Sequence, residues 1–73
     1  MIIRYSSHAL VRRGQRTIPK EEIERAITLG IKSVAQGGAR MTTHKTKTKS
    51  LVVIYQIISV REIKVITAYY QQP

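Results

Sequence analysis

Several residue types are missing from this 73-residue chain, and each absence excludes a kind of chemistry. It has no Cys, Asp, Asn, Phe or Trp, and its only acidic residues are four Glu. Without Cys the chain forms no disulfide and has no thiol nucleophile, and two His alone are too few for a closed structural zinc site. Three of the four Glu lie within residues 21–24, whereas magnesium-dependent nucleases need clustered carboxylates from several segments. We therefore expect no metal and no cofactor.

Long hydrophobic runs are also missing. No stretch approaches the roughly 18 apolar residues that a membrane-spanning helix needs. The opening stretch of residues 1–5 is too short, and Arg and His come too soon, for a secretory signal. We expect a cytoplasmic protein without a membrane segment.

Positive charge is what the sequence has in excess. Thirteen Lys and Arg against four Glu give a net charge of +9, which favours a polyanionic partner such as RNA. The 42% hydrophobic content indicates a folded domain rather than a disordered basic tail. A chain of this length forms one domain, residues 1–73, with a thin core and little room for an enclosed pocket.

The hydrophobic pattern predicts two helices followed by strands. A basic amphipathic helix is expected over residues 8–16, with Leu10, Val11 and Gly14 on its inner side, and a second helix from Pro19 to Gly30. Extended patterns follow, with turn signals between them, at residues 31–36, 39–44, 50–58 and 62–70. The fold class is α+β, with two N-terminal helices packed on one face of an antiparallel sheet of about four strands.

The first helix carries the strongest candidate for catalysis. His8, Arg12 and Arg16 are spaced by four residues and share one helix face, with Arg13 adjoining. Histidine exchanges protons near neutral pH, and guanidinium groups bind phosphate, so the set suits metal-free phosphoryl transfer. The same spacing is also typical of a solvated basic helix face.

A second basic group lies in the middle of the chain, at Arg40, His44, Lys45, Lys47 and Lys49. If this segment is extended, its three lysines project to one side and can follow a phosphate backbone. A solubilising loop or a protected sheet edge would have the same composition.

The last strand adds Thr67 and Tyr69 on one face and Tyr70 on the other. Tyrosines beside a basic surface stack on unpaired bases or donate to phosphate, but they more often pack in the core with the hydroxyl at its rim.

Together these residues resemble a known family. Ser6, His8, Ala9, Arg12, Arg16 and Ile18 match the opening signature of the small prokaryotic family called domain of unknown function 4258, and the closing Val-Ile-Thr-Ala-Tyr at residues 65–69 is similar to its last strand. That family is similar to the RelE, barnase and colicin-type group of ribonuclease toxins. The resemblance implies metal-independent ribonuclease activity, with His8 and Arg12 at the centre of the site and Arg16, Thr67 and Tyr69 in support.

The leading hypothesis is a metal-independent endoribonuclease, the toxin of a toxin–antitoxin pair, that cleaves RNA through attack by the 2′-OH. Its partners would be transfer, messenger or ribosome-bound RNA and an acidic antitoxin, and the chain would be a monomer or a homodimer. Bound RNA would also contact Arg13, Arg40 and the three lysines. The alternatives are a non-catalytic basic module that binds RNA or DNA, and an interaction subunit that docks an acidic protein.

Overall fold

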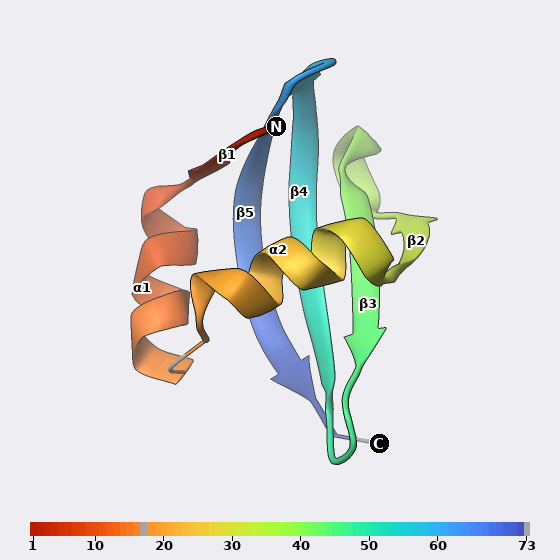
Figure 1. Cartoon of the computed structure of the whole chain (residues 1–73). Coiled ribbons are helices and arrows are strands. Elements are labelled where there is room, and N and C mark those ends of the chain that lie inside the picture. The colour runs from red at the N-terminus through yellow and green to blue at the C-terminus, as the bar shows by residue number, and fades with distance from the viewer. Residues whose placement is uncertain (17, 73) are drawn as a thin grey trace.

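The part of the chain that the structure describes folds into two helices and a five-stranded sheet (Figure 1). The computed structural model describes the backbone of residues 1–16 and 18–72, and the side chains of these residues other than 12, 15 and 16. In chain order the elements are β1 (Ile2–Tyr5), α1 (Ser7–Arg16), α2 (Lys20–Leu29), β2 (Ile31–Val34), the 3-10 turn η1 (Gln36–Gly38), β3 (Arg40–Lys45), β4 (Ser50–Ser59) and β5 (Glu62–Gln71).

The sheet is mixed, with strand order β1-β5-β4-β3-β2. The predicted α+β class, the two helices and the four antiparallel strands β2 to β5 are confirmed. The prediction missed β1, which precedes both helices and pairs parallel to β5. Four residues are too few for a recognisable pattern, and their partner lies about 60 residues later in the chain, so no local signal marks this pairing.

Helix α2 forms as its sequence predicts. Pro19 stands at its N-cap, Glu21 and Glu22 lie in its first turn, and Ile23, Ala26 and Ile27 are buried. Acidic residues at this end interact favourably with the helix dipole, and the three buried residues share one face. In Figure 1, α2 crosses in front of β5, β4 and β3.

Helix α1 is where the predicted buried side is wrong. Leu10 and Val11 are 48% and 56% exposed, whereas Ala9 is only 1% exposed. The chain is fixed at Ser6, whose backbone N–H donates to the Val65 carbonyl at 2.9 Å and whose hydroxyl donates to the Ile66 carbonyl at 2.8 Å. This attachment to β5 turns Ala9 inward, and its small side chain lets the helix lie close to the strand.

The two faces of the sheet differ in what covers them. Both helices pack on the face that we call the helix face, which carries Leu51, Val53, Tyr55, Ile63, Val65, Ala68 and Tyr70. The register places Thr43, Val52, Ile54, Thr67 and Tyr69 on the opposite side, the open face, which no described helix covers. Val52 is nevertheless buried there, between its cross-strand neighbours Thr43 and Tyr69.

Candidate functional site

The N-terminal turn of α1 is held against β5. The Ser6 hydroxyl, besides donating to Ile66, accepts a hydrogen bond from the Ala9 backbone N–H at 3.0 Å, so Ser6 caps the helix and ties it to the strand. His8 lies two residues after Ser6, with its side chain exposed. Nothing local in the sequence indicates the hydrogen bond from the Ser6 hydroxyl to Ile66, the residue beside Thr67.

Of the three arginines of α1, the structure describes the side chain of Arg13 alone. Arg12 and Arg16 belong to the helix, but their side chains lie outside the described residues. Arg13 is half-buried: its Nη1 donates weakly to the Ile18 carbonyl at 3.5 Å, and its guanidinium carbon lies 6.0 Å from the centre of the Tyr5 ring. Arg13 therefore packs between α1 and the start of α2. Burial, followed by the charge of Glu24, raises the pKa of Tyr5 above its ordinary value.

Thr67 and Tyr69 share the open face, as the alternation predicted, because they oppose Ile54 and Val52 in regular register. Both are half-buried, so each leaves part of its surface to solvent. No hydrogen bond among the described residues links either of them to His8.

Tyr70 faces the other way and belongs to the packing. Its hydroxyl donates to Glu22 Oε2 at 2.5 Å, and the Lys49 ammonium lies 3.8 Å from the centre of its ring. Burial and this hydrogen bond to Glu22 raise the pKa of Tyr70 to about 12. Tyr70 thus fastens β5 to the first turn of α2.

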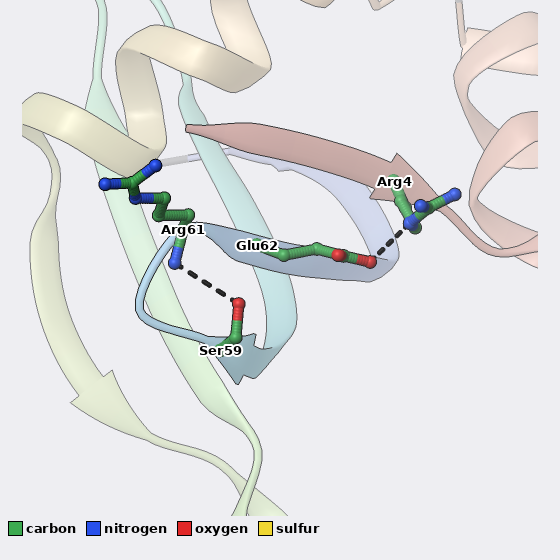
Figure 2. A network of polar contacts seen from close by, with 4 residues as sticks. All are labelled: Arg4, Ser59, Arg61 and Glu62. Atoms are coloured by element: carbon green, nitrogen blue, oxygen red, sulfur yellow. Dashed lines mark hydrogen bonds and ion pairs between the residues drawn. The ribbon is translucent and has the colours of Figure 1, made fainter.

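The open face carries unopposed positive charge. The register places Arg4, Lys45, Glu62 and Lys64 on it, and Arg4 forms an ion pair with Glu62 along the parallel β1–β5 edge (Figure 2). Figure 2 also shows the turn before β5, where the Arg61 backbone N–H donates to the Ser59 hydroxyl at 3.3 Å. The one acidic side chain that the register places on this face is therefore neutralised by Arg4, which leaves the charges of Lys45 and Lys64.

The segment that carries Lys45, Lys47 and Lys49 is not extended beyond Lys45, where β3 ends. Residues 46–49 close the β3–β4 hairpin, where the Thr46 backbone N–H and hydroxyl both donate to the Lys49 carbonyl, at 2.8 and 2.7 Å. Lys45 ends β3 on the open face, while Lys49 turns to Tyr70 on the helix face. The tight turn therefore separates the lysines, which do not form one stripe, and Lys47 lies exposed in the turn.

The other two members of the basic group lie on the helix face. Arg40 opposes Tyr55 and is exposed, and His44 opposes Leu51 and is half-buried. Neither shares a face with Thr67 and Tyr69, so the structure divides the predicted nucleic-acid contacts between two sides of the sheet.

Among residues 1–16 and 18–72 no three His, Cys, Asp or Glu side chains gather as metal ligands would. No helix in the described part of the chain has the length and apolarity needed to cross a membrane.

Comparison of the chain with family models, curated proteins and solved structures gives no match. The resemblance to the domain of unknown function 4258 family therefore stays a prediction.

Proposed function

We propose that this chain binds RNA across the open face of its sheet and cleaves it without a metal ion. One observation carries the proposal. The Ser6 hydrogen bonds hold the first turn of α1, with exposed His8, beside the strand that carries Thr67 and Tyr69. A proton-transfer group, an aromatic ring and a hydroxyl thus come from two elements fixed to each other.

The chemistry that suits these groups is attack by the ribose 2′-OH on the adjacent phosphorus. His8 takes the proton from the 2′-OH, the bond from phosphorus to the 5′-oxygen breaks, and Tyr69 or the protonated histidine gives a proton to that oxygen. The products are a 2′,3′-cyclic phosphate and a 5′-hydroxyl. Arg12 and Arg16 neutralise charge on the phosphate, Thr67 donates to it, and Lys45 and Lys64 bind the flanking strand.

An enzyme of this kind would act as a toxin held in check by an antitoxin, as the family resemblance implies. Expression of the chain in a bacterial host then arrests growth, and His8→Ala relieves the arrest. An equally abundant His8→Ala protein that still stops growth would separate toxicity from cleavage.

The direct test is incubation of the purified chain with total RNA and with transfer RNA in excess chelator, followed by analysis of the product ends. A positioned proton-transfer group contributes about 10²- to 10⁴-fold in rate, so His8→Ala should lose cleavage by a factor in that range. The matched control is His44→Ala, which removes the chain's other histidine from the face of the sheet opposite Thr67 and Tyr69 and should cut at the wild-type rate. Cleavage by His8→Ala as fast as by wild type refutes the assignment.

The second candidate is a binding module without catalysis. This function is favoured because no hydrogen bond among the described residues joins His8 to Thr67 or to Tyr69. RNA that is retarded in a gel but recovered whole, with binding that is insensitive to His8→Ala and weakened by Tyr69→Ala, would establish this function. Tyr69→Phe discriminates further, because it keeps stacking and removes the proton donor.

A further inference from the structure

A shallow trough crosses the helix face beside α2. Two hollows, of about 430 and 400 Å³, meet at Tyr55 and Ile57 on β4. One continues to Val34 on the edge strand β2, and the other continues to Val60 in the turn between β4 and β5. Figure 1 shows that the sheet extends past α2 toward this turn.

The trough exposes apolar side chains that a folded chain normally covers. Ile57 is 56% exposed, Val34 is 70% exposed, and Val60 is fully exposed. Contiguous apolar surface with a polar rim marks interaction sites on small proteins. Burial of these side chains by a partner would continue the helix layer that α2 begins.

The charge of the rim selects the partner. Arg40 and Lys32 line the hollow next to β2, and no acidic side chain is among the described residues that line either hollow. The Lys32 ammonium already donates to the Gly30 carbonyl at 3.0 Å, at the C-terminal end of α2, whereas Arg40 has no carboxylate partner among the described residues. A second copy of this chain would bring another +9 to the same place, so an acidic partner is favoured electrostatically.

The length of the trough suits a helix. From β2 to β5 it spans three strand intervals of about 4.8 Å, roughly 14 Å, which a helix of about ten residues covers. α2 has ten residues and crosses three of these strands, β5, β4 and β3. We propose that this trough binds an amphipathic acidic helix of a partner protein, with its apolar residues on Ile57 and Val60 and a carboxylate facing Arg40.

The proposal does not rest on RNA cleavage, because the trough and the open face lie on opposite sides of the sheet. Its test is selection from a displayed library of 14-residue helical peptides against the full chain, followed by fluorescence anisotropy with the enriched peptides. We expect these peptides to repeat apolar residues at helical spacing with Glu or Asp beside them. Ile57→Glu and Val60→Glu should each weaken binding by about tenfold or more.

The matched control is Ile31→Glu, which alters an equally apolar and exposed side chain on the opposite face and should change binding by less than about twofold. Arg40→Glu should weaken the acidic peptides more than the same peptides with Gln in place of Glu. The proposal is overturned if no peptide is enriched, if enriched peptides are neutral or basic, or if they bind Ile57→Glu as tightly as wild type. A wild-type dimer that Ile57→Glu dissociates in sedimentation experiments would assign the trough to a second copy and also overturn it.

Discussion

Gly30 ends α2, and the structure predicts that replacing it with alanine destabilises the fold although its backbone is unstrained. Its φ of −72° and ψ of 166° suit any residue. A Cβ at this position would lie 2.5 Å from the Ala26 carbonyl oxygen and 2.9 Å from the Thr43 carbonyl oxygen, and in still closer contact with Thr42 Oγ1. Two of these three atoms are backbone oxygens and cannot rotate away.

The magnitude follows from two opposing effects. Overpacking of a filled site costs about 1 to 3 kcal/mol, and the reduced freedom of the unfolded chain returns about 0.4 to 1 kcal/mol. The free energy of unfolding of Gly30→Ala should therefore fall by about 1 to 2 kcal/mol, which lowers the Tm by on the order of 5 to 15 °C in a domain of this size. Thr42→Ala added to Gly30→Ala should not restore stability, because the two carbonyl contacts remain.

Gly14→Ala is the matched control, with the opposite sign. Gly14 lies inside α1, and an added Cβ there meets nothing within 4 Å. Alanine is favoured over glycine in a helix interior by about 0.5 to 1 kcal/mol, so this variant should unfold at higher temperature than wild type. Thermal and urea denaturation followed by circular dichroism measure both variants. A Gly30→Ala protein as stable as wild type would refute the close packing of α2 against β3.

Two further predictions concern charge. The pKa of Tyr70 is raised from 10.0 to about 12 in the folded chain, so its contribution to stability is complete below pH 10 and is lost as the pH rises from 10 to 12. Between pH 9 and pH 11.5 the free energy of unfolding, measured by urea denaturation, should fall more for wild type than for Tyr70→Phe. An equal fall in both proteins would contradict the Tyr70–Glu22 contact. If RNA lies on the open face, Lys64→Ala should reduce the slope of the logarithm of the binding constant against the logarithm of the salt concentration by on the order of 0.7. Lys20→Ala, which alters a lysine beside Tyr5 on the helix face, should leave this slope unchanged. Equal reductions in the two variants would place RNA elsewhere.

The two proposed surfaces would let one small domain bind two partners at once. The open face carries Thr67 and Tyr69, and the trough carries Ile57 and Val60 on the other side of the same sheet. A helix bound in the trough would therefore leave the open face accessible to RNA. Regulation of cleavage by such a helix would need a change in the sheet or in α1 rather than direct occlusion.

Local pattern was sufficient for most of the secondary structure. Helix α2 begins after Pro19 and ends before Gly30, as predicted. Gly37 and Gly38, which have positive φ, lie between β2 and β3, where the turn was expected. The alternation of β5 correctly separated Tyr69 from Tyr70. These features depend on residues close in sequence, whose conformational preferences and 3.6- or 2-residue periods act within each element.

Tertiary structure alone decided the rest. Three features depend on segments that meet only in the fold. These are the parallel pairing of β1 with β5, the inward orientation of Ala9 that the Ser6 hydrogen bonds impose, and the separation of Lys45 from Lys49 on opposite faces of the sheet. A short helix with several acceptable inner faces takes the one that its anchor and its neighbouring strand impose, and a basic run is divided when a turn reverses it. The sequence by itself therefore determined both helices, the four strands that follow them and the excess of positive charge, while packing between distant segments determined the pairing of β1 and which side chains share a surface.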